Sequence, residues 1–266
     1  IYPFFYTFWL SLHEWDMIGS QTFVGLRHFQ EIFLFDERGW WPSMYNALFI
    51  TFFALTLQNI LAFVLALGVD KAVRMGNFYR VVFFILPILA EIIIGLLMRD
   101  MFVNDPGVFN RLLGFIGLDS LQRDWLGNEH NALITAALVH GWKGFGWGFI
   151  IFLAGLQTIP QQLYEAARID GANSFQCFQR ITLPLMIPVI VMVVILTILG
   201  SMQAFAMILT LTRSVVTVPV MLIYNHIKSN LVGLASAEGV IIGIILVSVS
   251  LIMMQISKLV KTRFGV

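Results

Sequence analysis

The stretch EAARIDGANSFQCFQRITLPLMIP, from Glu165 to Pro188, is polar and broken by a glycine, yet it lies between two long apolar segments. Just before and into this stretch, the residues IPQQLYEAARID include many good helix formers, and Pro160 suits a helix N-terminus. Gly171 then predicts a turn. The first half of the passage therefore predicts a short helix that ends at a glycine bend.

A second helix is predicted over about 172–181, and its apolar residues Phe175, Phe178 and Ile181 recur at a spacing of three on one side. Pro184 is expected to end this helix. The passage thus predicts two amphipathic pieces that form a bracket outside the membrane. An exposed apolar bracket favours a partner that covers it. The alternative is a loop that lies on the lipid surface.

The composition around this passage indicates an integral membrane protein. Hydrophobic residues make up 59% of the chain and charged residues 12%, whereas soluble domains carry about 25% charged residues. A transmembrane helix needs about 20 apolar residues, and the short alternating segments of a barrel are absent. We therefore expect an all-α membrane protein. The net charge of +1 gives no basic field that would attract nucleic acid.

Six membrane spans are predicted, of which the first is incomplete. The apolar start over residues 1–12 is too short to span a membrane, so we expect part of that helix before Ile1; a cleaved signal peptide is the weaker alternative because no basic flank or cleavage site is visible. The other spans are expected at about 45–69, 81–103, 132–156, 185–211 and 234–256, with a cytoplasmic loop at about 160–184, all in one domain over 1–266.

Basic residues in short loops favour the cytoplasmic side. The density of basic residues is highest in three short segments, which contain Lys71, Arg74, Arg80, Arg168, Arg180, Lys258, Lys261 and Arg263. This density places the quoted passage and the C-terminus in the cytoplasm.

The quoted passage resembles the E-A-A, three residues, G, nine residues, I-x-L-P signature of membrane subunits of ATP-binding-cassette importers. The matching residues are Glu165, Ala166, Ala167, Gly171, Ile181, Leu183 and Pro184. FVGLRHF (Phe23 to Phe29), FYRVVFFILP, GVFNRLLGFIGL, DWLGN and LAGLQTIP are similar to segments of the sugar-importing permeases of the maltose and glycerol-phosphate type. His28 replaces the usual asparagine of that pattern.

The resemblance implies the six-span fold of a type I importer permease, in the first of two paired permeases. It also implies a coupling helix that sits in a cleft of the ATPase subunit, with Glu165 facing basic groups and Gly171 permitting the bend. The coupling residues expected on this basis are Glu165, Ala166, Ala167, Asp170, Gly171, Phe175, Phe178, Ile181 and Pro184. The implied partners are a second homologous permease, two ATPase subunits, an extracytoplasmic solute-binding protein, a sugar and membrane lipid, in a bacterial or archaeal plasma membrane.

One segment departs from the family pattern. The family often carries L-T-x-G-G-P after the fifth span, whereas LTLTRSVVTVPVM lacks the Gly-Gly-Pro sequence. Either this loop differs, or residues are missing between Arg213 and Val218.

The chain carries no pattern for catalysis of its own. A P-loop needs Gly-Lys, and that dipeptide does not occur here. We therefore expect ATP and Mg²⁺ to bind to a separate ATPase, with no cofactor on this chain. The five histidines lack metal-ligand spacing, so no metal site is predicted. Cys177 has no partner for a disulfide within the chain.

Polar residues within apolar spans suggest a substrate path, because such groups usually face a cavity or another helix. Glu91 lines the path or is protonated and bonded between helices. Trp142 and Lys143, with neighbouring aromatic residues, suit either a sugar or an interfacial aromatic belt. Gln58 and Asn59 are expected to bond between helices. Ser201, Gln203 and Phe205 are at the place where the resemblance implies the sugar site. Glu238 faces the outer vestibule or marks the interface.

These observations predict one membrane subunit of an ATP-driven sugar importer that works by alternating access. Two alternatives remain at this point: a permease of the same class for another solute, and an ion-driven secondary transporter, which would need internal repeats with broken helices. A membrane enzyme would need clustered catalytic groups, and the sequence shows none.

Overall fold

A computed structural model describes residues 2–36, 39–71, 76–103 and 107–264 of the chain. Arg74, which was expected in a cytoplasmic loop, lies outside the described residues, as do the side chains of Lys71, Lys261 and Arg263. The described residues are mainly helical, as expected. The strands seen in these ranges are β1 (His13–Glu14) and β2 (Thr22–Phe23), which pair antiparallel with His13 opposite Phe23.

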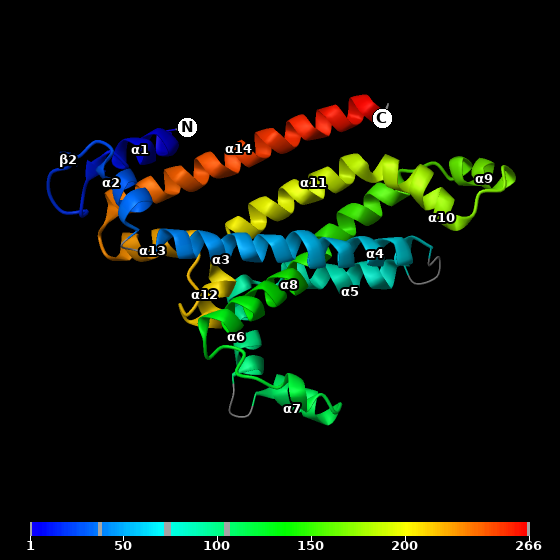
Figure 1. Cartoon of the computed structure of the whole chain (residues 1–266), viewed down its shortest axis with the longest axis horizontal. Helices are drawn as coiled ribbons and strands as arrows, with labels where there is room; N and C mark the ends of the chain where they lie inside the picture. The colour runs from blue at the N-terminus through cyan, green and yellow to red at the C-terminus, as the bar shows by residue number, and fades with distance from the viewer. Residues whose placement is uncertain (1, 37–38, 72–75, 104–106, 265–266) are drawn as a thin grey trace. The chain divides into compact units, whose positions relative to one another are not determined.

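The helices of the first half of the chain are α1 (Tyr2–Leu10), α2 (Arg27–Gln30), η1 (Glu31–Phe35), α3 (Trp40–Phe53), η2 (Ala54–Gln58), α4 (Asn59–Lys71), α5 (Gly76–Ile88), α6 (Glu91–Phe102), α7 (Val108–Phe115) and η3 (Asp119–Leu121). Those of the second half are α8 (Glu129–Gln157), α9 (Gln161–Ile169), α10 (Ser174–Cys177), η4 (Phe178–Thr182), α11 (Leu183–Met202), α12 (Ala206–Thr212), α13 (Pro219–Lys228) and α14 (Val232–Phe264). Figure 1 labels the larger of these elements along the chain.

Among the described residues, four helices are long and apolar enough to cross a membrane: Trp40–Asp70, Glu129–Gln157, Ser174–Met202 and Val232–Ile256. A fifth candidate is the pair Phe78–Ile88 and Glu91–Phe102, whose axes differ by 94°. The membrane protein expected from composition is confirmed, and the count of six spans stays a prediction because α1 has only nine residues.

Two expected spans differ from the structure in their course. Residues 81–103 were expected as one span but form α5 and α6, which bend near Pro87; a proline removes a helix hydrogen bond and promotes such kinks. Residues 185–211 were expected as one helix, but α11 ends at Met202 and α12 begins at Ala206. Phe205 has φ −143° and ψ −67°, which interrupts the helix between them.

The described chain forms two compact units. The first contains Ile1–Thr51, Glu91–Val139 and Gly200–Ser248, and the second contains Phe52–Ala90, His140–Leu199 and Val249–Val266. In the first unit α6 packs on α12, where Gly95 of α6 lies against Met207 and Thr210. Small residues allow this close approach of two helices. Asn46 also donates from Nδ2 to the carbonyl oxygen of Thr217 at 3.0 Å, which fixes the loop before α13.

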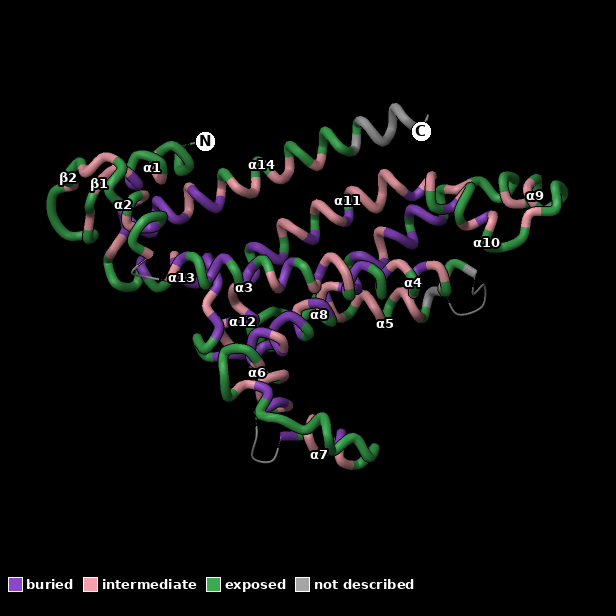
Figure 2. Tube along the Cα trace, viewed as in Figure 1, coloured by how far each residue is buried: buried purple, intermediate pink, exposed green. Residues whose placement is uncertain are grey.

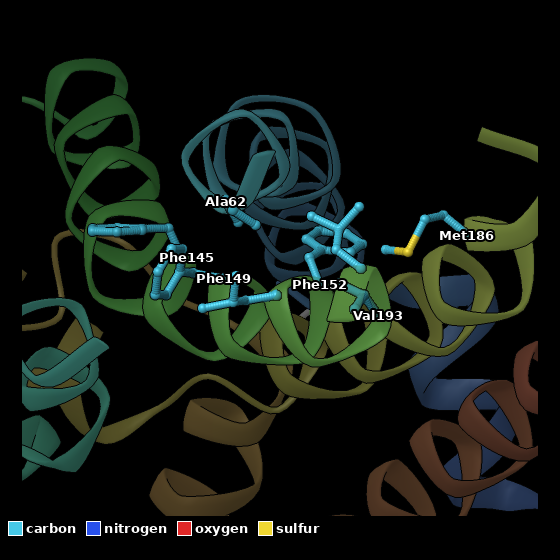
Figure 3. Close-up of a cluster of buried hydrophobic side chains, with 9 residues drawn as sticks. Ala62, Phe145, Phe149, Phe152, Met186 and Val193 are labelled. Atoms are coloured by element: carbon cyan, nitrogen blue, oxygen red, sulfur yellow. The ribbon is translucent and has the colours of Figure 1, made fainter. Parts of the chain in front are cut away.

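The second unit has an apolar core between α4, α8 and α11, shown in Figure 3. Phe149 and Phe152 of α8 pack there with Ala62 of α4 and Met186 of α11, all at most 2% exposed. Gly148 faces Ala62, and a Cβ on this glycine would lie 3.2 Å from the Ala62 Cβ. The pattern of small and aromatic residues therefore sets the distance between α4 and α8.

Candidate coupling site and substrate path

The first arm of the predicted bracket is α9 (Gln161–Ile169), which begins after Pro160 as the sequence indicates. It carries Glu165, Ala166 and Ala167, and the Glu165 side chain is exposed. Asp170 caps the helix, with its N–H donating to the Ala166 carbonyl oxygen at 3.0 Å. Glu165 and Asp170 are therefore exposed carboxylates, one within the short helix α9 and the other at its C-terminal end.

Gly171 makes the bend between the two arms. Its φ is +80°, a left-handed conformation that side chains with a Cβ rarely adopt. The N–H of Gly171 donates to the Arg168 carbonyl oxygen at 3.1 Å, and the N–H of Ala172 donates to that of Ala167 at 2.9 Å. These two bonds satisfy the last carbonyl groups of α9 and fix the reversal of the chain.

The second arm is continuous with a long helix. α10, the π-helical η4 and α11 run on as one helix over Ser174–Met202. The expectation that Pro184 ends the second arm is therefore wrong. Pro184 lies in the first turn of α11, directly after the π-helical turn, where a missing N–H is tolerated.

The two arms are braced against each other and against α4. The hydroxyl groups of Tyr164 and Thr182 lie 2.8 Å apart, and the Phe178 ring lies 6.3 Å from that of Phe63 between centroids. Ile181 is partly buried. The base of the bracket is thus fixed by packing and by a hydrogen bond.

The tip of the bracket exposes apolar side chains. Ile169 is 86% exposed and Phe175 is 69% exposed, and Figure 2 shows most of α9 as exposed. The bracket thus presents two large apolar side chains to its surroundings above a packed base.

Three residues expected on the substrate path lie around the break between α11 and α12, in the first unit. Ser201 is buried, and its hydroxyl donates to Thr51 Oγ1 at 2.8 Å. Gln203 is exposed in the break. Phe205 is half-buried, and its ring lies 5.1 Å from that of Tyr224. The structure thus brings Gln203 and Phe205 to an accessible break, while Ser201 supports the packing behind it.

Glu91 is the first residue of α6, at the sharp bend with α5, and its side chain is exposed. The expectation placed this carboxylate in the middle of a straight span, whereas the structure places it at a helix N-terminus. Negative charge is favourable there because the helix dipole is positive at that end.

In the second unit, Trp142 and Lys143 lie in α8, where Trp142 is 39% exposed and Lys143 is half-buried. The adjacent Phe145 is in the apolar core. Asn59 Oδ1 accepts a hydrogen bond from the Thr197 hydroxyl at 3.1 Å, which joins α4 to α11 as expected of an interhelical residue. A Cβ on Gly144 would lie 2.5 Å from Gln58 Oε1, so Gln58 packs directly on α8.

Comparison with known sequences decides the family. Residues 58–265 match the family described as "Binding-protein-dependent transport system inner membrane component". The chain belongs to this family. Its expected identity as a permease of a binding-protein-dependent importer in the inner membrane is therefore confirmed.

The permease is similar over almost its whole length to named transport proteins. It is 30% identical over 263 residues to the trehalose/maltose transport system permease protein MalF of Thermococcus litoralis. This match covers 97% of this chain and 88% of that protein. It is 29% identical to the arabinooligosaccharides transport system permease protein AraP of Bacillus subtilis, over 97% of this chain and 83% of that protein. These relatives are permease proteins of transport systems.

The fold of the permease matches a solved transporter. A chain of a bacterial ABC transporter involved in the import of the acidic polysaccharide alginate superposes with a TM-score of 0.76 at 21% identity. The match covers 97% of the permease and 90% of that chain. At this identity the likeness shows the fold alone, which is that of an importer permease.

The residue that caps the second arm of the permease bracket was not predicted from the sequence. Asn173 begins α10, where its Oδ1 accepts from the Gln176 N–H at 2.9 Å and its own N–H donates to Gln176 Oε1 at 2.8 Å. This reciprocal pair is a capping box. The Asn-x-x-Gln spacing after Gly171 was the signal in the sequence that could have found it.

Two further residues of the permease are now placed in its first unit. Glu238, expected to face a vestibule or an interface, is 1% exposed and lies 2.9 Å from Nδ1 of the buried His226. His28, which departs from the family asparagine, is 7% exposed, and its Nε2 lies 3.3 Å from the His13 carbonyl oxygen. His226 thus joins α13 to α14, and His28 joins α2 to β1. Among the described residues, no three His, Cys, Asp or Glu side chains are placed to share a metal ion.

Proposed function

We propose that this chain is the transmembrane subunit of an ATP-driven sugar importer and forms half of the translocation pathway. It pairs with a second, homologous permease, two ATPase subunits and an extracytoplasmic solute-binding protein. Support comes from the named relatives, which include a trehalose/maltose and an arabinooligosaccharide permease protein. A solved neighbour was crystallised with an alginate pentasaccharide-bound periplasmic protein.

The bracket from Gln161 to Thr182 carries the coupling in this proposal. ATP bound at the partner closes the ATPase dimer and moves the bracket. The bracket in turn tilts the helix Ser174–Met202, because no loop separates the two. The continuity of this helix is the observation that carries the proposal. Hydrolysis on the ATPase then resets the permease, which completes alternating access.

In this mechanism the chain supplies surfaces and no bond-breaking groups. Glu165 faces basic groups on the ATPase, and Ile169 and Phe175 enter an apolar cleft there. ATP and Mg²⁺ belong to the partner. Gln203, Phe205, Trp142 and Lys143 are proposed to contact sugar, since aromatic rings stack on its C–H face while polar groups bond its hydroxyls.

A charge reversal at the bracket tests the proposal. The transporter is reconstituted in liposomes with its binding protein, and uptake of radiolabelled maltose, trehalose and arabinooligosaccharides is followed with ATP inside. We expect uptake of one of these sugars, and we expect Glu165→Lys to reduce its ATP-dependent uptake about tenfold or more, equivalent to roughly 1.4 kcal/mol.

Glu129→Lys is the matched control, because this glutamate is also exposed in a helix but lies at the start of α8. It should leave uptake unchanged. Uptake that needs an ion gradient and no ATP would overturn the proposal in favour of a secondary transporter. ATP-dependent uptake confined to solutes other than sugars would support the proposed coupling to ATP and would contradict the proposed sugar substrate.

A further inference from the structure

α7 (Val108–Phe115) has an inner face that is firmly packed, within the first unit. Phe109 lies 4.9 Å from Phe102 and 5.2 Å from Trp125 between ring centroids, and Leu113 is 8% exposed beside them. Phe102 is the last residue of α6. One side of α7 is thus built into an aromatic cluster at the end of α6.

Hydrogen bonds fix the rotation of α7 about its axis. Asn110 Oδ1 accepts from Trp125 Nε1 at 2.8 Å, and Asn110 Nδ2 donates to the Arg123 carbonyl oxygen at 3.0 Å. The Thr135 hydroxyl donates to the Trp125 carbonyl oxygen at 3.0 Å, which ties the cluster to α8. A rotation that hid the outer side of α7 would break these bonds and bury their polar groups unpaired.

The outer side of α7 is an apolar ridge of four residues. They share high exposure: Val108 48%, Leu112 51%, Phe115 90% and Ile116 62%. At 100° per residue these side chains occupy one sector of the helix, which adjoins the packed face. Arg111 is exposed on the flank of this ridge. Figure 2 shows much of the α7 segment as exposed.

In water such a ridge is costly, since burial of one Phe or Leu side chain is worth about 1.5–3 kcal/mol. We propose that the α7 ridge lies in the interfacial layer of the bilayer, with Arg111 among the lipid phosphates. An aliphatic and aromatic ridge flanked by a basic residue is the pattern of a helix that lies in the membrane surface.

The place of α7 in the chain supports a lipid occupant over a protein. It follows α6, which also exposes large apolar side chains, with Ile93 at 52% and Leu97 at 58%. It precedes α8, and both α8 and the α5–α6 pair are apolar enough to cross a membrane. The ridge therefore continues an apolar surface at the level where spans leave the hydrocarbon layer.

Spin labels on α7 test this inference in the assembled transporter in liposomes of phosphatidylethanolamine and phosphatidylglycerol. Cys177 is the one native cysteine, so a Cys177→Ser background gives a single labelling site. Nitroxides are attached at Phe115→Cys and Leu112→Cys, with Arg111→Cys as the matched control on the same helix. Accessibility to oxygen, which concentrates in lipid, is compared with accessibility to a water-soluble nickel chelate.

We expect the oxygen-to-nickel ratio to be several-fold higher at 112 and 115 than at 111. Equally low ratios at all three sites would show an aqueous ridge, and labels reached by neither relaxant would show a ridge covered by protein; both overturn the inference. A phospholipid with a photoactivatable acyl chain tests the unmodified protein, and it should label the peptide 108–121. Neither readout needs ATP or sugar, so a failure here and a failure of the transport proposal remain distinguishable.

Discussion

At the residue scale, the turn after α12 has an unusual backbone conformation in the segment that lacks the expected Gly-Gly-Pro sequence. After α12 the family pattern carries Gly-Gly-Pro, whereas this chain has Arg213 and Ser214 with φ of +47° and +67°. Side chains with a Cβ disfavour this region. The turn after α12 is therefore built from two residues that disfavour its backbone conformation, and Asn46 holds the following loop through Thr217.

Ser214→Gly should accordingly stabilise the first unit by about 1 kcal/mol, because glycine adopts a positive φ without strain. Ser229→Gly is the matched control, since Ser229 caps α13 with φ −89° and gains nothing from glycine. Melting of the purified protein followed by tryptophan fluorescence checks both. Equal decreases in melting temperature for the two variants would contradict the strain argument.

At the element scale, a helix cap, a π-helical turn, a helix break and close helix contacts position the coupling bracket and the spans. The capping box of Asn173 starts the long helix that leads to α11, and the π-helical η4 carries that helix past Thr182 to Pro184. The break at 203–205 ends it. The cap, the π-helical turn and the break each act through a few backbone hydrogen bonds.

Asn173→Ala should loosen the start of α10 by about 1 kcal/mol, since the cap bond to Gln176 is lost. Asn173→Ser keeps an acceptor and should behave like the natural residue. Hydrogen exchange of the Gln176 amide is the measurement, with roughly fivefold faster exchange expected in the alanine variant. Unchanged exchange would mean that the bracket does not depend on its cap.

Gly95→Ala should weaken the contact between α6 and α12 by about 1–3 kcal/mol, because the new methyl group would lie 2.7 Å from the Met207 carbonyl oxygen. Gly243→Ala in α14 is the control, since nothing lies within 4 Å of a Cβ there. Thermal melting of both variants distinguishes steric overlap from a general glycine effect. The interpretation fails if Gly95→Ala melts at or above the temperature of the control.

At the scale of the whole molecule, the sequence predicted the features that depend on local pattern. The spacing of the motif residues from Glu165 to Pro184 predicted the position of the bracket and of its bend at Gly171. Long apolar runs predicted the positions of the helices. It missed the bend between α5 and α6 because one proline in an apolar run also occurs in straight spans. It missed the burial of Ser201 and Glu238 because their partners, Thr51 and His226, come from other helices. Tertiary contacts of this kind leave no periodic signal.

Large apolar surfaces remain uncovered within the chain. Only 11% of the most apolar window of α14 is buried, and Ile244, Val247, Leu251 and Met254 are each more than half exposed. Their spacing of three, four and three residues is that of a helix-packing stripe. Such a surface requires lipid or another helix.

Co-purification with the proposed partner permease should therefore raise the melting temperature of this chain by several degrees relative to the chain alone, because binding to the folded state stabilises it. Both samples are measured in the same detergent and at the same concentration. Identical melting temperatures would show that the second permease does not cover these surfaces.

The uninterrupted helix from Ser174 to Met202 has a mechanical consequence. Its 29 residues give a length of about 43 Å at a rise of about 1.5 Å per residue. A tilt of about 5° at one end then displaces the other end by roughly 4 Å. A lever of this length can convert a small rotation at the inner surface into a motion large enough to open or close a passage, without any change in its own hydrogen bonds.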